Sequence, residues 1–217
     1  MKAYKAYIFD LDGTLLDSMG VWDQIDADFL AKRGIALPPD YMNSISSMTY
    51  HEAAVYTIKR FALPDSIDGL KREWNDMAAY AYGNTVQMKP YAKEYLMTLR
   101  ERGAKLAVAT SLSPELREPV LRRNGIDSVF HAVCDTNEAG YGKTRPDVFL
   151  LAAKKIGAMP CDCLVFEDIL AAIKSAKSVG MNACAVYDRS SENDWEKIKA
   201  EADYAIVDFR DAPLSAD

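Results

Sequence analysis

Four short apolar runs, separated by helical patterns, constrain the fold of this chain more than any other feature of its sequence. The runs are rich in aromatic and β-branched residues and have the length of buried strands. The helical patterns between them begin at Pro or Ser-Pro and end at Gly. Strands that alternate with helices predict a parallel sheet with helices on both faces, an α/β fold of the doubly wound type. The four runs are residues 4–9, 106–109, 164–166 and 183–186.

Residues 17–85 interrupt this alternation, because nothing in that stretch has the pattern of a strand. We therefore expect an inserted all-helical module at residues 17–85 and an α/β core at residues 1–16 and 86–217. A single domain with additional packed helices is the alternative. Three groups of apolar residues are spaced for one helical face, namely Trp22, Ile25 and Phe29; Val55, Ile58 and Phe61 behind a capping box at Thr49 and Glu52; and Ile67, Leu70, Trp74, Met77, Ala78 and Ala81.

The composition is that of a globular, acidic protein. The 217 residues are 49% hydrophobic and 27% charged, which suffices for one large or two small domains. The chain has 32 acidic and 26 basic residues and a formal charge of -6. Binding to nucleic acid or to anionic membranes needs a basic surface, so we expect neither partner. We expect a small-molecule substrate and a monomer or weak dimer.

The sequence also favours a cytoplasmic protein. No apolar run approaches the roughly 18 residues of a spanning helix, and Asp10 and Asp12 stand where a signal peptide would be apolar. The 4 cysteines include a C-x-C pair, Cys161 and Cys163, but no pair of C-x-x-C motifs. Reduced thiols in the core are therefore expected rather than disulfides or zinc.

Polar residues follow the expected strands at their carboxyl ends, where doubly wound sheets bind ligands. Carboxylates that gather there raise one another's pKa unless a cation compensates them, and hard oxygen ligands favour Mg²⁺. The metal and Lys143 would attract a phosphate oxygen, as phosphoryl transfer requires. The residues concerned are Asp10-Leu11-Asp12-Gly13-Thr14, Thr110-Ser111, Gly142-Lys143 and Glu167-Asp168.

With these motifs in this order, the chain resembles the haloacid dehalogenase-like hydrolase superfamily, in the branch that includes phosphoglycolate phosphatase and β-phosphoglucomutase. The resemblance covers nearly the whole chain. It implies a Rossmann-like core with a helical cap, and a Mg²⁺-dependent phosphatase that acts on a small phosphorylated metabolite through an aspartyl-phosphate. The motifs that carry it are Asp10-Leu11-Asp12-Gly13-Thr14, Thr110-Ser111, Gly142-Lys143-Thr144-Arg145-Pro146-Asp147 and Phe166-Glu167-Asp168.

The resemblance also implies roles for single residues. Asp10 is expected to be the nucleophile, and Asp12 to protonate the leaving oxygen and then activate water. Because side chains at i and i+2 of an extended segment project to the same side, this spacing suits two cooperating carboxylates. Lys143 and Thr110 are expected to bind the phosphate together with main-chain donors near Leu11, Asp12 and Ser111. Mg²⁺ is expected to be bound by Asp10, the carbonyl of Asp12 and Asp168, with Glu167 either coordinating the ion directly or contacting it through another ligand.

Each motif also has a plainer interpretation. Asp12-Gly13 alone is typical of a turn. Thr110 could cap the next helix, although Ser113-Pro114 already provides a start for that helix. Glu167-Asp168 could serve only as favourable charges at a helix N-terminus. Lys143 on a loop is typical of a solvated charge. Residues 142–144 imitate the end of a P-loop, but Asn137 stands where that motif needs glycine.

In the family, the inserted helices form a cap that opens and closes over the site, so hinges are expected near residues 15–17 and 83–86. Where the mutase carries Lys and Arg for a second phosphate, this chain has Ser46 and Tyr50, which favours a phosphatase over a sugar phosphomutase. A phosphate-sensing or interaction module without turnover is a further alternative. Arg145 is either a surface variant or a substrate contact. Candidate substrate contacts in the cap are Trp22, Asp23, Asp26, Tyr50 and His51, with Trp22 equally suited to core packing.

Overall fold

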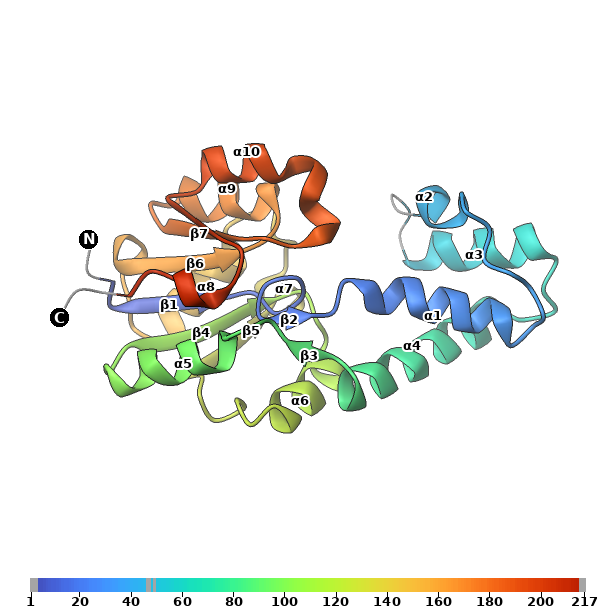
Figure 1. Ribbon diagram of the computed structural model, residues 1–217, viewed down its shortest axis with the longest axis horizontal. Helices are drawn as coiled ribbons and strands as arrows, with labels where there is room; N and C mark the ends of the chain where they lie inside the picture. The colour runs from blue at the N-terminus through green and yellow to red at the C-terminus, as the bar shows by residue number, and fades with distance from the viewer. Residues whose placement is uncertain (1–3, 46–47, 49, 215–217) are drawn as a thin grey trace. The chain divides into compact units, whose positions relative to one another are not determined.

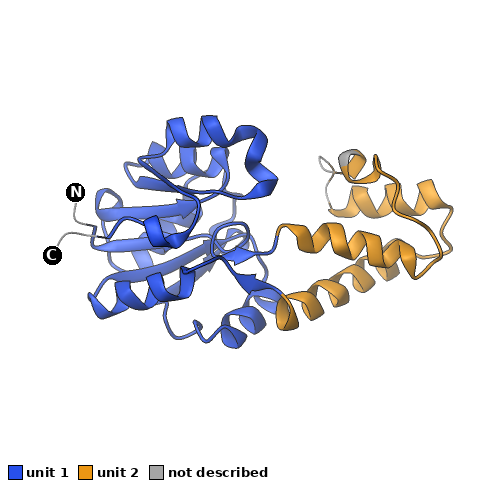
Figure 2. Cartoon of the chain, viewed as in Figure 1, with its two compact units in different colours: residues 1–18, 86–217 blue, residues 19–85 orange. Residues whose placement is uncertain are grey.

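A computed structural model of the chain describes residues 4–45, 48 and 50–214. The chain divides into two compact units (Figure 2), one of residues 1–18 and 86–217 and the other of residues 19–85. Ser46 and Thr49, which the sequence analysis singled out, lie outside the described residues.

The larger unit is built on a six-stranded parallel sheet with the order β5-β4-β1-β6-β7-β8 (Figure 1). β1 lies in the interior, with β4 on one side and β6 on the other. The chain therefore proceeds in opposite directions from β1, and the carboxyl end of β1 is the switch point at which such sheets bind ligands. The strands are β1 (Ala6–Phe9), β4 (Lys105–Thr110), β5 (Ala132–Asp135), β6 (Cys163–Glu167), β7 (Asn182–Val186) and β8 (Tyr204–Ile206).

This sheet confirms the α/β fold class. The four predicted strands correspond to β1, β4, β6 and β7, whereas β5 and β8 were not predicted. Both are edge strands and only partly buried, so neither needs the continuous apolar run by which buried strands are recognised.

Helices cover both faces of the sheet. α8 packs on β1, β4 and β5, and α9 packs on β6 and β7, with α10 against α9. Ala6 and Ile8 of β1 point into the core shared by α8 and α9. The helices are α5 (Ala92–Glu101), α6 (Pro114–Arg123), α7 (Thr136–Ala139), α8 (Asp147–Lys155), α9 (Leu170–Ser178) and α10 (Trp195–Glu201), with 3-10 turns η1 (Pro160–Asp162), η2 (Arg189–Asp194) and η3 (Phe209–Asp211).

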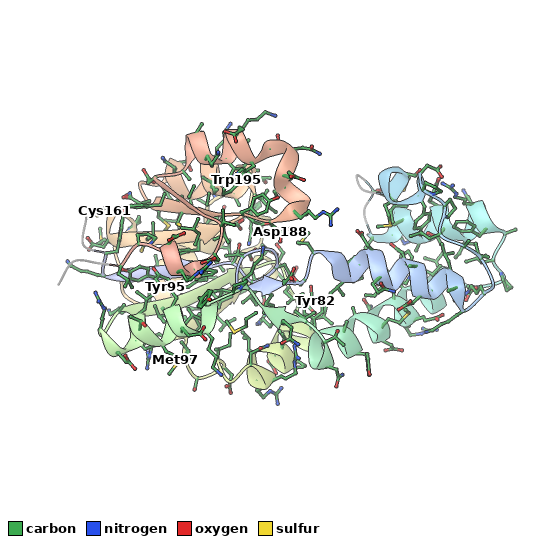
Figure 3. The ribbon with its side chains drawn as sticks, viewed as in Figure 1. Tyr82, Tyr95, Met97, Cys161, Asp188 and Trp195 are labelled. Atoms are coloured by element: carbon green, nitrogen blue, oxygen red, sulfur yellow. The ribbon has the colours of Figure 1, made fainter. Side chains whose placement is uncertain are left out.

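The other face of the sheet is aromatic. Phe9 and Phe166, which are paired in the register of β1 and β6, stack with ring centroids 4.7 Å apart. Tyr95 of α5 (Figure 3) packs against both rings. Because side chains alternate along a strand, the small residues of β1 face one layer of helices and its aromatic residues face the other. This packing holds β1 and β6 firmly side by side.

The smaller unit is helical, and all three predicted helical patterns are present. α1 and α3 pack on α4, which begins where Ser66 accepts a hydrogen bond from the Gly69 amide at 3.0 Å. Arg33 donates to Asp65 and to Glu73, each at 2.7 Å. The helices are α1 (Gly20–Ala31), the short α2 (Tyr41–Ile45), α3 (Tyr50–Phe61) and α4 (Ile67–Asn84).

A two-stranded antiparallel ribbon, which was not predicted, borders the helical unit in sequence. β2 (Leu16–Asp17) pairs with β3 (Gln87–Met88), too short a pair for a periodic pattern. Among the described residues, no helix is both long and apolar enough to cross a membrane. Cys134, Cys163 and Cys184 are buried free thiols, and the free thiol of Cys161 is exposed, so the expectation of core thiols is wrong for Cys161.

Candidate active site

Three buried carboxylates meet at the carboxyl end of the two central strands. Asp10 follows β1, Glu167 ends β6 and Asp168 comes next in the chain. One carboxylate oxygen of each lies within 4.8 Å of the others. The parallel register brings them together, because Phe9 pairs with Phe166 and the next residues are Asp10 and Glu167.

Lys143 supplies the positive charge of this cluster from the loop between α7 and α8. Its ammonium contacts Asp10 Oδ1 and donates to Glu167 Oε1 at 2.6 Å. The second oxygen of Glu167 accepts from the amides of Asp168 at 2.9 Å and Ile169 at 3.1 Å. Both oxygens of Glu167 are therefore engaged, and this residue fixes Lys143 beside Asp10.

The pKa values of the cluster reflect its burial. Burial raises the pKa of Asp10 to about 7, although Lys143 opposes the shift. Burial, together with the charges of Glu167 and Asp10, raises the pKa of Asp168 to about 9. Burial disfavours the Lys143 ammonium, but attraction to Asp10 and Glu167 raises the pKa of Lys143 above its ordinary value. One ammonium thus faces three carboxylates, and the cluster lacks positive charge.

A divalent cation with oxygen ligands fits this deficit. The cluster consists of carboxylates only, which are the hard donors that Mg²⁺ prefers over the His and Cys ligands typical of zinc. Asp10 and Asp168 are the residues that suit direct coordination, because Glu167 is held by Lys143 and two amides.

Gly13 and Thr14 shape the turn after β1 around Asp168. Gly13 has a φ of +74°, and a Cβ added there would lie 2.8 Å from the carboxyl carbon of Asp168. The Thr14 hydroxyl donates to Asp168 Oδ1 at 3.3 Å. Both residues belong to the first sequence motif, and this close approach explains why a glycine stands at position 13.

Asp12 is not one of the three clustered carboxylates, although its charge contributes to the raised pKa of Asp10. Within the described chain, the metal-type group does not include Asp12, whose half-buried carboxylate accepts from the Ser18 hydroxyl at 2.6 Å. The Thr14 amide donates to the Leu11 carbonyl at 3.2 Å, so the chain turns through Asp12 and Gly13 directly after the strand. Ser18 was missed, since a lone serine after the motif carries no sequence signal of its own.

Thr110 ends β4, which lies beside β1, and Ser111 follows it. Thr110 is buried, and its hydroxyl accepts from the Leu112 amide at 3.0 Å, while Ser111 is exposed. Ser113 is the N-cap residue of α6 and Pro114 its first residue, as predicted, although the Ser113 side chain makes no capping bond to the described helix. Thr110 orders the start of the loop through its bond with Leu112.

Arg145 lies on the same loop as Lys143. Its guanidinium stacks over the Tyr141 ring at 3.5 Å from the centroid and pairs with Asp147 at 3.1 Å. Tyr141 and Arg145 thus hold each other across Lys143, two residues away on either side. Such an exposed cation–π contact contributes roughly 0.5–1 kcal/mol.

The candidate substrate residues of the helical unit differ in exposure. Asp23 and His51 are exposed, whereas Trp22 is half-buried and meets the Tyr50 ring edge-to-face at 6.1 Å. The Tyr50 hydroxyl donates to the Lys71 carbonyl at 3.2 Å or to Asn75 Oδ1 at 2.9 Å. Asp26 is buried beside Tyr41, and burial raises its pKa to about 7.

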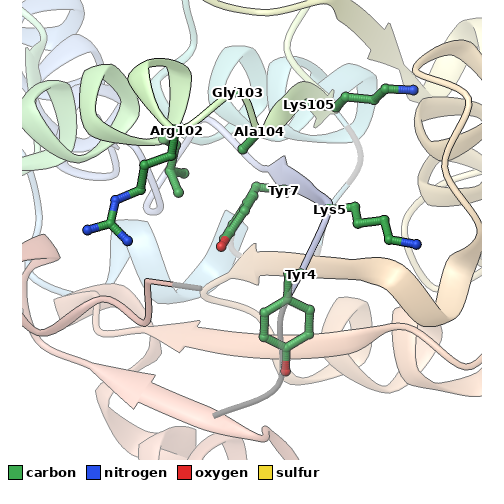
Figure 4. A pocket seen from close by; sticks show the side chains of 8 residues that line it. Tyr4, Lys5, Tyr7, Arg102, Gly103, Ala104 and Lys105 are labelled. Carbon is green, nitrogen blue, oxygen red and sulfur yellow. The ribbon is translucent and has the colours of Figure 1, made fainter. Parts of the chain in front are cut away.

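Two cavities of the larger unit lie outside this cluster. One of about 320 Å³ lies at the amino ends of β1 and β4, lined by Tyr4, Lys5, Tyr7, Arg102 and Lys105 among others (Figure 4). Another of about 410 Å³ lies between α9 and η2 and is lined by Ile169, Lys174 and Ser190 among others. Neither is lined by the clustered carboxylates.

Comparison with known proteins agrees with this geometry. An Arabidopsis thaliana bifunctional riboflavin kinase/FMN phosphatase is 28% identical over 85% of this chain, which spans only 49% of that relative. A Drosophila melanogaster protein named Probable pseudouridine-5'-phosphatase is 27% identical over 94% of this chain and 90% of its own length.

A solved structure shows the same fold. A Thermotoga maritima protein described as a β-phosphoglucomutase superposes with a TM-score of 0.82 over 93% of this chain and 94% of its own, at 22% identity. The family model described as haloacid dehalogenase-like hydrolase matches residues 4–180, most of the chain. The protein therefore belongs to the haloacid dehalogenase-like hydrolase family.

Proposed function

We propose that this protein is a Mg²⁺-dependent phosphatase that hydrolyses a small phosphorylated metabolite. The observation that carries the proposal is the contact of Lys143 with Asp10 and Glu167 beside Asp168, at the switch point of the sheet. A nucleophilic carboxylate, a fixed ammonium and a metal site then belong to one buried cluster. The family membership and the names of two relatives, both phosphatases, support the same chemistry.

The reaction proceeds in two displacements. A carboxylate oxygen of Asp10 forms a bond to phosphorus while the bond from phosphorus to the leaving oxygen breaks, and Asp12 gives that oxygen its proton. Asp12, now a carboxylate, takes a proton from water, and the water oxygen attacks the aspartyl-phosphate. Inorganic phosphate leaves and Asp10 returns as a carboxylate.

The environments of the two aspartates suit these roles. Asp10 is buried and held by Lys143, which limits its motion and excludes water. Asp12 is half-buried, and its carboxylate accepts a hydrogen bond from Ser18, so it lies where the attacking water can reach it in the second step. An acid that must protonate and deprotonate in every cycle needs this access.

The remaining residues bind the cation and the phosphoryl group. Asp10 and Asp168 would hold Mg²⁺ with the carbonyl of Asp12, and the bound cation would supply positive charge to the phosphoryl oxygens. Lys143 neutralises the same oxygens from the loop between α7 and α8, with Glu167 holding it in place. Thr110 and the amides near Leu11, Asp12 and Ser111 complete the phosphate site, and the helical unit serves as the cap.

A phosphomutase is the second candidate. A mutase must hold two phosphates and therefore needs cations in its cap. At Tyr50 this chain offers a hydroxyl that donates to groups of its own helical unit, Lys71 and Asn75. This arrangement favours the hydrolase.

The experiment is a Mg²⁺-supported screen of sugar, nucleotide and small-acid phosphates that measures both free phosphate and isomerised product. Release of phosphate that is lost with Asp10→Asn or with a chelator supports the phosphatase. Isomerisation that depends on a bisphosphate, without release, selects the mutase. Lack of both selects the module without turnover.

A further inference from the structure

Lys89 and Asp188 form a nearly buried ion pair within the larger unit. The Lys89 ammonium lies 2.6 Å from Asp188 Oδ2, and the two side chains are only 10% and 5% exposed. Lys89 also donates to the Tyr187 carbonyl at 2.8 Å. Lys89 comes directly after β3, and Asp188 (Figure 3) comes two residues after the end of β7. The pair therefore connects the end of the β2–β3 ribbon to the carboxyl end of a strand of the main sheet.

The acidic cluster lies at the same carboxyl ends of the strands. β7 is the neighbour of β6, and Glu167 pairs with Ala185 in their register. The chain beyond β7 therefore continues on the same side as Asp168. Asp168 comes one residue after Glu167, and Asp188 comes three residues after Ala185, the register partner of Glu167. Asp188 is thus a fourth carboxylate at the carboxyl end of these two strands.

Asp188 is ionised in the pair. Burial acts to raise the pKa of Asp188, but hydrogen bonds from Lys89 and from the hydroxyl and amide of Ser190 lower it below its ordinary value. Because little water surrounds the pair, removing either partner leaves a poorly screened charge beside the cluster.

We propose that the charges of Lys89 and Asp188 act in opposite directions on the affinity of the acidic cluster for its divalent cation, with Lys89 cancelling the charge of a carboxylate that is not a ligand. The inference rests on the Mg²⁺ site of the proposed function. Both residues are positioning residues that act on the cation through its ligands.

The test uses opposite changes of charge. Lys89→Met leaves the Asp188 carboxylate and should lower the Kd for Mg²⁺ at least about threefold, whereas Asp188→Asn leaves the ammonium and should raise it at least about threefold. The double variant carries neither charge and should return to within about twofold of the wild type. The readout is calorimetric titration of Mg²⁺ into the metal-free protein without substrate.

A matched control comes from the amino ends of β1 and β6, where the largely exposed Lys5 pairs with Asp162 at 3.4 Å. Lys5→Met makes the same change of charge and should leave the Kd unchanged. If Lys89→Met does not fold, Asp188→Asn and the double variant still decide the matter, because a purely structural role predicts shifts of the same sign in both.

The outcomes separate the two proposals. If Mg²⁺ binding is lost in Asp168→Ala, but the Lys89 and Asp188 variants bind Mg²⁺ with the Kd of the wild type, this inference alone is overturned. Shifts of one sign in all variants also overturn it. A wild-type protein that binds no Mg²⁺ overturns this inference together with the proposed cofactor.

Discussion

Gly13 and Asp168 approach each other so closely that only a residue without a side chain fits at position 13. An added Cβ would lie 2.8 Å from the Asp168 carboxyl carbon, in a turn with a φ of +74°. The glycine of the first motif therefore makes room for the carboxylate of the last one, although more than 150 residues separate them in the sequence. Two motifs that look independent in the sequence are therefore in direct contact in the fold.

Gly13→Ala should therefore displace Asp168 and weaken Mg²⁺ binding and phosphatase activity at least about 100-fold, a loss of about 2.7 kcal/mol in each free energy. The positive φ adds a loss of stability of about 1–2 kcal/mol. Gly103→Ala is the control, because Gly103 has the same φ of +74° and no described atom lies within 4 Å of its Cβ. Comparable activity in the two variants would show that the contact with Asp168 is unimportant.

Lys143→Met should lower the free energy of unfolding by about 3–5 kcal/mol at neutral pH in the metal-free protein, because Asp10 and Glu167 lose their buried counter-charge. Phosphate release should fall below detection. Arg145→Met, on the same loop but exposed, should cost less than about 1 kcal/mol. Urea denaturation measures both; equal losses in the two variants would contradict the assigned role of Lys143.

The stability of the metal-free protein should fall as the pH rises from about 5 to about 9. Folding raises the pKa of Asp10 to about 7 and of Asp168 to about 9, above the unfolded values of about 4. The native state then binds more protons than the unfolded state within this window, so the free energy of unfolding decreases with pH. Saturating Mg²⁺ should remove most of the decrease, since the cation replaces the protons.

Thermal denaturation at several pH values, with and without Mg²⁺, checks this. The carboxyls whose pKa is lowered, such as Asp65 and Asp188, act on stability only below about pH 4, and the raised pKa of Lys143 acts only above its unfolded value of about 10.4. A stability that is constant or rises between pH 5 and 9 without metal would refute the electrostatic description of the cluster.

Asp26→Asn should stabilise the protein by at least about 1 kcal/mol near pH 8 and change little below about pH 4, because burial raises the pKa of Asp26 to about 7 and the amide resembles its protonated form. Asp23→Asn, on the exposed side of the same helix, removes only the smaller contribution to the raised pKa of Asp26 and should stabilise the protein less near pH 8 than Asp26→Asn does. The difference between the two variants in urea denaturation separates Asp26 from the cluster in the pH dependence above. A destabilising Asp26→Asn at pH 8 would show that the ionised form is needed.

Much of the fold follows from the sequence because the interior strands are apolar on both faces. β1, β4, β6 and β7 were predicted, and their parallel arrangement brings Asp10 and Asp168 to one edge. The edge strands β5 and β8 were missed because they are short and partly exposed. The predicted helices of residues 17–85 are present because their apolar stripes pack on one another.

Details of side-chain direction could not be predicted. The turn at Leu11 sends Asp12 toward Ser18, and the two amides after β6 take one oxygen of Glu167. The pairing of Lys89 with Asp188 joins residues 99 positions apart, and no local pattern marks either one. Such contacts depend on tertiary packing, which periodicity does not record.

The most direct test of the account is to trap the covalent intermediate. Asp12→Asn should still let Asp10 attack but should slow hydrolysis, so a quenched reaction with a substrate of good leaving group should yield a peptide phosphorylated on Asp10. The Asp10→Asn variant should yield none under the same conditions. Mass spectrometry that finds phosphate on Asp10 in the first variant is the predicted result. Turnover by the wild type together with undiminished turnover in Asp10→Asn, or phosphate on another residue, would contradict it.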